Sequence, residues 1–275
     1  PFNDTPTTEI YTYTESSAAS DVYKRQDTVH VEVSDEGRAR VREAYGRDCV
    51  NAEAALEGAE VIVLAVPDTH IGNVAGGIID KVPAGAMVVC LDAAAPFAGH
   101  LPERSDITYF VSHPCHPPIF NDETDMVAKR DHFGGIAAKQ GVVNTLFQGP
   151  EEHYALGEKV AKAIYAPVAN SYRVSIEGMA LLEPGLSETV CASLLLVMRE
   201  AMDEVIARGV PADAARDFLL GHMNILGAVI FDEVEGVFSD ACNKAIEFGK
   251  PVLMKDDWKR VFEPEEIKAS ILRIT

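Results

Sequence analysis

The fold of this chain is decided by the stretch Glu60-Val-Ile-Val-Leu-Ala-Val-Pro-Asp-Thr-His70. Residues 61–66 are apolar at every position, which is typical of a strand buried on both faces at the centre of a parallel sheet. Pro67 ends this pattern, and residues 71–81 then follow a helical pattern. A buried strand that leads directly into a helix is the repeating unit of an α/β sheet.

Further strand and helix patterns alternate along the first part of the chain. Helices are predicted at residues 35–45, at 52–57 with Asn51 as the N-cap, and at 71–81. Strands are predicted at residues 28–33, 48–50, 60–66, 86–92, 107–112, 142–148 and 170–175. This alternation predicts an α/β fold with a doubly wound, Rossmann-like parallel sheet.

The pattern changes near residue 176, after which only helices are predicted. They span residues 187–208, 212–232, 239–248 and 264–273. The run Cys191-Ala-Ser-Leu-Leu-Leu-Val-Met198 is apolar on all sides, which predicts burial in a core or between subunits. We therefore expect a dinucleotide-binding domain at residues 27–176 and an all-helical substrate and dimerisation domain at 177–275.

Composition narrows the class of partner. The formal net charge is -19 with only 24 basic residues, which argues against nucleic acid and anionic membranes as partners and favours a small molecule. The five cysteines are widely spaced, as expected of reduced thiols in a cytoplasmic protein. The longest dense apolar run, at residues 190–198, is shorter than the roughly 20 residues that a membrane span needs.

Residues 1–26 differ from the rest of the chain. They are rich in Thr, Ser and Tyr and lack either structural period, and the run Asp21-Val-Tyr-Lys-Arg-Gln26 resembles a translated sequencing adaptor. We interpret them as a foreign segment that replaces the first βα unit of the sheet; a natural flexible tail is the alternative.

Glu32 stands where a dinucleotide-binding sheet carries the carboxylate that binds the adenosine ribose, which favours NAD over NADP. A solvated strand-end carboxylate is the alternative. The glycine-rich loop expected about 20 residues earlier is missing. Either the protein binds no dinucleotide, or its first βα unit is lost and this chain itself binds NAD weakly and is inactive; we favour the loss.

Two consecutive strand ends form the predicted remainder of an NAD crevice. Backbone amides after the first strand end would face a phosphate or ribose, and small residues after the second would let a nicotinamide ring approach. The predicted cofactor-binding residues are Ala65, Val66, Pro67, Asp68, His70, Asp92 and Ala93, together with Glu32.

A turn rich in proline follows the strand at residues 107–112, in the run His113-Pro-Cys-His-Pro-Pro118. Proline has a fixed φ, so this turn should hold its two histidines rigidly. His113 is predicted as a general base, and His116 as a substrate or divalent metal ligand; histidines with purely structural roles are the alternative. Asn121 and Asp122 are predicted to hydrogen-bond a polyol substrate.

Several motifs resemble those of a known family. The Ala-Val-Pro strand end at residues 65–67, the later His-Pro strand end and the helical second domain together resemble the 6-phosphogluconate-dehydrogenase-like NAD(P) oxidoreductases. Ser112-His-Pro114 looks like a segment of prephenate dehydrogenases, whose histidine accepts the hydroxyl proton. The runs at residues 91–97, 113–122 and 182–188 look closer to the D-apionate oxidoisomerase family, whose members carry a phosphogluconate-dehydrogenase-type C-terminal domain.

This resemblance implies an NAD-dependent enzyme that oxidises a CH–OH group of a small sugar-derived hydroxy acid such as D-apionate and then isomerises the product. Related hydroxyacid dehydrogenases carry a catalytic lysine near the position of Pro184, where this chain has a carboxylate, Glu183, beside it. Glu183 is therefore predicted as a catalytic residue and, with His116, as a ligand of a possible divalent metal. Glu188 and His222 are predicted to contact substrate.

The expected assembly is a homodimer. A prephenate-dehydrogenase-like or simple hydroxyacid dehydrogenase is the nearest alternative function. A non-redox metal- or ligand-binding protein is the alternative from a different class, which the missing glycine loop supports.

Overall fold

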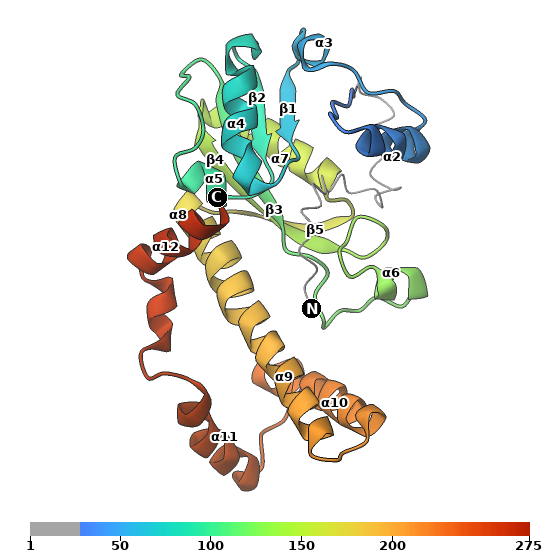
Figure 1. Cartoon of the computed structure of the whole chain (residues 1–275), viewed down its shortest axis with the longest axis vertical. Helices are drawn as coiled ribbons and strands as arrows, with labels where there is room; N and C mark the ends of the chain where they lie inside the picture. The colour runs from blue at the N-terminus through green and yellow to red at the C-terminus, as the bar shows by residue number, and fades with distance from the viewer. Residues whose placement is uncertain (1–27) are drawn as a thin grey trace. The chain divides into compact units, whose positions relative to one another are not determined.

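The computed structural model describes residues 28–275 (Figure 1). They divide into two compact units: the first runs to Ala180 and also contains Lys268–Thr275, and the second is Leu181–Ile267. Our predictions of a foreign segment at residues 1–26 and of a lost first βα unit lie outside the described residues.

A five-stranded sheet forms the centre of the first unit, with the strand order β1-β2-β3-β4-β5. Its strands are β1 (Val61–Leu64), β2 (Met87–Cys90), β3 (Thr108–Pro114), β4 (Gln140–Gln148) and β5 (Val168–Arg173). The predicted α/β class is confirmed, because β1, β2 and β3 pair in parallel, as do β4 and β5.

The predicted parallel sheet contains one antiparallel pair, β3 and β4. The segment between them contains only the short helix α6 (Met126–Arg130) and no long helix that crosses the sheet, so the chain returns in the opposite direction.

Two predicted strands are not formed. Residues 28–33 and 48–50 are extended, and Val50 donates a backbone hydrogen bond of 2.9 Å to His30. Neither segment joins the described five-stranded sheet, so neither has the continuous ladder of hydrogen bonds that defines a strand. Glu32 consequently lies in a loop before a helix rather than at the end of a strand.

Helices cover both faces of the sheet, as β2 illustrates. Val88 and Cys90 belong to the same core cluster as Ile71 of α4 (Asp68–Ile78). Met87 and Val89 point the other way, into the cluster that contains Ala161 of α7 (Tyr154–Ile164). This alternation buries both faces of a central strand and makes the sheet doubly wound.

The first unit contains further helices, two of which begin at a side-chain cap. Ser34 caps the helix that begins at Asp35, and Asn51 caps the one that begins at Ala52. Each side chain accepts a backbone hydrogen bond, as predicted for Asn51. These further helices are α2 (Asp35–Tyr45), α3 (Ala52–Leu56), α5 (Ala94–Phe97), α8 (Ile176–Ala180) and the end of α12 (Pro264–Ile274).

The second unit is helical, which confirms the predicted change of structure. After a π-helical segment, Leu181–Ala192, come α9 (Ser193–Ala207), α10 (Ala212–Ile230) and α11 (Asp240–Leu253), and a 3-10 helix, Trp258–Phe262. The helix predicted from residue 187 thus begins earlier than expected. Pro184 lies inside the π-helical segment, where its missing N–H disturbs the ordinary α-helical hydrogen bonding.

The apolar run at residues 191–198 is exposed in this chain rather than enclosed by it. Leu195 is 46% exposed and Leu196 is 50% exposed, so burial in a core of the same chain is excluded and burial against another molecule remains.

The continuous helix Ile176–Ala207 is also long and apolar enough to cross a membrane, contrary to our expectation that no segment reaches that length. A helix that is buried against a partner chain can be equally long and apolar. Length and composition alone therefore do not identify a membrane protein.

Candidate active site

The site lies where the first three strands of the sheet end. Because β1, β2 and β3 are parallel, their carboxyl ends meet at one edge, which is the edge where open α/β sheets bind ligands. Cys90 of β2 pairs with Val111 of β3. Asp92 and His113 each lie two residues beyond that pair, so the register itself brings the carboxylate and the imidazole together.

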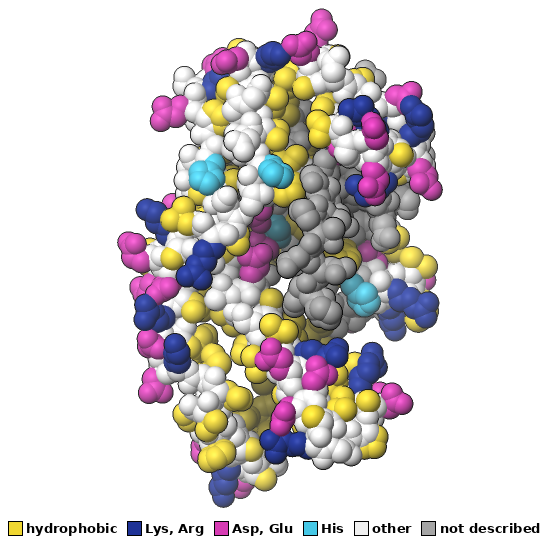
Figure 2. Space-filling model, in the orientation of Figure 1, with side chains coloured by type: hydrophobic (Ala, Val, Ile, Leu, Met, Phe, Trp, Pro, Cys, Tyr) yellow, Lys and Arg dark blue, Asp and Glu magenta, His cyan; other side chains and the backbone are white. Residues whose placement is uncertain are grey.

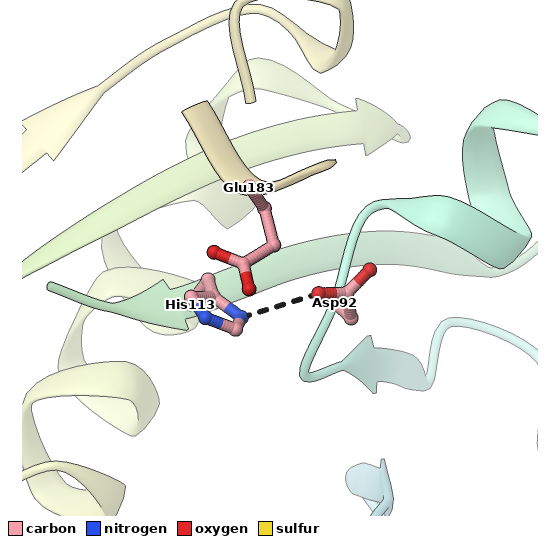
Figure 3. Close-up of side chains that lie close together, drawn as sticks. All are labelled: Asp92, His113 and Glu183. Atoms are coloured by element: carbon pink, nitrogen blue, oxygen red, sulfur yellow. Dashed lines mark ion pairs between the residues drawn. The ribbon is translucent and has the colours of Figure 1, made fainter. Parts of the chain in front are cut away.

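The His113 ring is held at two points (Figure 3). Its Nδ1 lies 2.9 Å from the carbonyl oxygen of Leu91 and 3.4 Å from Oδ2 of Asp92. A carbonyl oxygen can only accept, so Nδ1 carries the hydrogen and Nε2 is the proton-accepting nitrogen of the neutral ring. Both side chains are 18% exposed, which reduces the screening of their interaction by water.

Asp92 is itself fixed in place. Its Oδ1 accepts a 2.7 Å hydrogen bond from the backbone N–H of Ala94, at the start of α5. We predicted Asp92 as a cofactor-binding residue, and the structure places its carboxylate beside His113. Burial, together with the carboxylates of Asp68 and Asp92, raises the pKa of the neighbouring Cys90 thiol to about 12.

Sequence reasoning missed a buried polar network behind His113. Ser112 donates a 2.7 Å hydrogen bond to Oδ1 of Asn144, and Nδ2 of Asn144 donates one of 2.9 Å to Ser171. The Tyr165 hydroxyl donates to the carbonyl oxygen of Ser112 at 3.1 Å. Ser112 and Asn144 are fully buried, so these bonds connect β3, β4 and β5 directly beneath the histidine. The signal for this network was the asparagine within the otherwise apolar centre of the β4 pattern.

His116 of the proline-rich turn lies beside His113. The two ring centroids are 6.3 Å apart and the rings are perpendicular. Nδ1 of His116 lies 2.8 Å from the carbonyl oxygen of Phe133, and the backbone of His116 has a φ of 59°, which is uncommon for a residue other than glycine.

Asn121 and Asp122 are exposed and lie further along the same loop. Asn121 hydrogen-bonds to Pro118 and Glu123, so its side chain shapes its own turn.

The predicted NAD-binding residues fit a dinucleotide at this edge. Ala93 is fully buried and small, so a flat ring can approach the backbone closely. Pro67 precedes α4 and provides no side-chain cap, which leaves the first amides of this helix for a ligand. Ala65, Val66 and Asp68 lie in the same turn, and His70 is exposed on the first turn of the helix.

Glu32 is buried, with 6% of its surface exposed, and its Oε1 accepts a 2.7 Å hydrogen bond from the backbone N–H of Ser34. A Cβ atom on Gly37 would lie 2.4 Å from Cδ of Glu32, so glycine is needed there for α2 to begin against this carboxylate.

Three predicted site residues belong to the second unit. Glu183 and Glu188 lie in its π-helical segment, where hydrogen bonds join residues five apart, so the two carboxylates share one helix face. His222 lies on α10, where its Nδ1 is 2.7 Å from the carbonyl oxygen of Phe218 and its ring stacks on the Phe218 ring.

Known proteins are similar to almost the whole chain. Residues 121–275 match the family described as "Phosphogluconate dehydrogenase (decarboxylating) C-term". The D-apionate oxidoisomerase of Rhizobium rhizogenes is 72% identical over 251 residues, which cover 91% of each chain. The D-apionate oxidoisomerase of Cupriavidus necator is 66% identical over 246 residues, which cover 90% of this chain and 89% of that protein.

A solved structure is similar at the level of the fold and of the sequence. It is the crystal structure of a semialdehyde dehydrogenase NAD-binding protein from Cupriavidus necator in complex with calcium and NAD. The TM-score is 0.91 at 63% sequence identity, and the match covers 94% of each chain.

Proposed function

This chain belongs to the D-apionate oxidoisomerase family, with a C-terminal part of the phosphogluconate dehydrogenase type, and from that premise we propose that it oxidises and isomerises D-apionate with NAD. The predicted family and the predicted class of NAD-dependent oxidoreductase are thereby confirmed. The observation that carries the proposal is the His113–Asp92 pair at the carboxyl ends of parallel strands, where this fold binds its ligands.

NAD, when bound, supplies the acceptor for hydride. In our proposal the carboxylate of Glu32 accepts hydrogen bonds from the adenosine ribose, and the amides at the start of α4 bind the pyrophosphate or ribose. Ala93 leaves room for the nicotinamide beside Asp92. The similar crystal structure that contains NAD supports this assignment.

His113 is the proposed general base. The substrate hydroxyl gives its proton to Nε2 of His113 while hydride leaves the same carbon, so that the CH–OH group becomes a carbonyl. Asp92 keeps Nδ1 protonated and stabilises the positive charge that the ring then acquires. A general base of this kind contributes about 10²- to 10⁴-fold to the rate.

The donor atoms of Asp92 and His113 also favour a second role, which is to bind a divalent cation. Asp92 and His113 (Figure 3) offer a carboxylate and an imidazole, both of which are ligands of divalent cations, and we propose Glu183 of the second unit as a further ligand. The crystal structure similar to this chain contains calcium, which supports a cation in this family. A bound cation would polarise the new carbonyl during isomerisation. In this role Nε2 of His113 is a ligand, and we assign proton acceptance to His116.

The experiment is a measurement of NADH formation from D-apionate by the wild-type protein, by His113→Ala, and by His100→Ala as a control in an exposed histidine of the same unit. We expect a loss of about 10²- to 10⁴-fold in kcat for His113→Ala and no change for the control. Equal rates in all three proteins would refute the role of His113.

Calorimetric titration with calcium or magnesium, without substrate, tests the cation role. Binding that Glu183→Gln and His113→Ala both weaken supports His113 as a ligand. Metal-free activity that resists a chelator assigns His113 to proton transfer alone. The control is Glu177→Gln, which changes an exposed carboxylate of α8.

The finer partner assignments are also proposals. We propose that the small hydroxy acid contacts Asn121, Asp122, Glu188 and His222, and that the protein works in the cytoplasm, where its five free cysteines stay reduced.

We also propose a homodimer formed through the second unit. Apolar side chains gather over its helices (Figure 2). In this unit Leu196 is 50% exposed, Phe231 68% and Phe248 77%. An apolar surface of this extent normally lies in an interface.

A further inference from the structure

Asp131 is a buried carboxylate that organises the loop between α6 and β4. Only 5% of its surface is exposed. Its Oδ1 accepts a 2.9 Å hydrogen bond from the backbone N–H of Gly134. Its Oδ2 accepts three more, from Ile136 at 3.0 Å, Ala137 at 2.9 Å and Ala138 at 3.1 Å. Burial alone raises the pKa of Asp131, but these four N–H groups outweigh it and hold the pKa below its usual value.

The same loop is fixed from its other side by Gln140. Gly134 has a φ of +82°, and a Cβ atom there would lie 2.4 Å from Nε2 of Gln140. That Nε2 donates a 2.9 Å hydrogen bond to the carbonyl oxygen of Tyr165 in the core of the unit. The loop is held in this conformation by the hydrogen bonds of its backbone to Asp131 and by its packing against Gln140.

The ordered loop presents one backbone group to the candidate active site. The carbonyl oxygen of Phe133 lies 2.8 Å from Nδ1 of His116, and the Phe133 ring meets the His116 ring edge-on with centroids 6.2 Å apart. A carbonyl oxygen cannot donate, so His116 must carry its hydrogen on Nδ1, and Nε2 becomes the nitrogen that can accept a proton or bind a cation. The ring of His113 lies against the same imidazole.

We propose that Asp131 is a positioning residue for His116: by holding Phe133 in place, it selects the tautomer and orientation of the imidazole. This inference rests on the proposed function and deepens it. When a cation occupies His113, His116 is the proposed proton acceptor, and Asp131 would hold its imidazole in the tautomer that can accept the proton. Outer partners that orient a histidine through its second nitrogen commonly change activity or metal affinity by about 10- to 100-fold.

The first test is an imidazole ¹⁵N NMR spectrum, with the His116 signals assigned by their loss in His116→Gln. We expect the Nδ1–H tautomer in the wild type and a mixture of tautomers in Asp131→Asn, whose amide would meet backbone N–H donors. Gly134→Ala disturbs the same loop independently and should have the same effect. The control is Thr145→Val, which removes a buried hydrogen bond to the carbonyl oxygen of Val174 and should leave His116 unchanged.

The second test is a double-mutant cycle on kcat/KM. Asp131→Asn should reduce it about 10- to 100-fold, and the reduction should vanish in a His116→Ala background. Additive losses, or an unchanged His116 tautomer in both loop variants, would overturn the inference. Absence of NADH formation from D-apionate even after a glycine-rich first βα unit is restored contradicts the proposed function instead, and the NMR result then decides the inference alone.

Discussion

Gly157 on α7 tests how closely this helix packs on the sheet. An added Cβ atom would lie 2.3 Å from Cδ2 and 2.4 Å from Cε2 of Phe110, a fully buried residue of β3. Carbon atoms at rest lie about 3.5–4.0 Å apart, so the ring or the helix must move by about 1 Å. The ring cannot move without displacing other core side chains, because Phe110 is fully buried in the cluster that contains Met87 and Val142.

Gly76 on α4 provides the matched control, because its added Cβ atom would meet nothing within 4 Å. In both helices the change to alanine gains about 0.5–1 kcal/mol of helix stability. We therefore expect Gly76→Ala to stabilise the protein by that amount. In Gly157→Ala an overpacking cost of about 1–3 kcal/mol opposes this gain. The free energies of unfolding of the two variants should therefore differ by that cost.

The assay is amide hydrogen exchange of α7 and α4, because the single tryptophan, Trp258, lies in the second unit and its fluorescence would follow the wrong part of the chain. The reasoning is refuted if Gly157→Ala raises the protection of α7 as much as Gly76→Ala raises that of α4. A Phe110→Leu background should relieve at least part of the cost of Gly157→Ala, because the two changes meet at one contact.

Three further predictions concern pH, assembly and cofactor choice. The thiol of Cys90 has its pKa raised from 9.0 to about 12, so the folded protein keeps a proton that the unfolded chain releases, and stability should fall as the pH rises through that window. Urea unfolding should show that the free energy of unfolding falls less between about pH 8 and pH 10.5 in Cys90→Ala than in the wild type. An equal fall in both proteins would show that Cys90 is not the cause. Leu196→Glu should convert a dimer to monomers in sedimentation experiments, whereas Glu235→Gln, on an exposed loop, should not; a wild type that is already monomeric would contradict the proposed interface. Glu32→Gln should weaken NAD binding about tenfold and reduce the ratio of the affinity for NAD to that for NADP, as measured by calorimetry. Unchanged affinities for both cofactors would show that Glu32 does not bind the cofactor.

Much of the local structure was predictable because it depends on neighbours in the chain. The apolar run at residues 61–66 predicted β1, and Asn51 predicted the start of α3. Asn51 also accepts the capping hydrogen bond that its position before α3 predicted. In each case the deciding interactions join residues that are close in sequence.

Other features were not predictable because they depend on which segments pair. A strand pattern has the same period whether its partner runs parallel or antiparallel, so nothing in the pattern of β4 indicated that it pairs with β3 in reverse. The segment 28–33 has a strand pattern but joins no ladder of the described sheet. The exposure of Leu195 and its neighbours depends on the packing of helices around them.

The sequence by itself determined the class of fold, the helical second part and the chemical type of the site residues, because hydrophobic period, capping residues and side-chain chemistry are local properties. Only the tertiary structure decided that Asp92 lies beside His113, that Asn144 bonds to Ser112, and that the carbonyl oxygen of Phe133 lies within hydrogen-bond distance of His116. The physical reason is that these contacts join residues 17 to 32 positions apart in the sequence. Strand register and loop closure set such contacts, and a local pattern encodes neither.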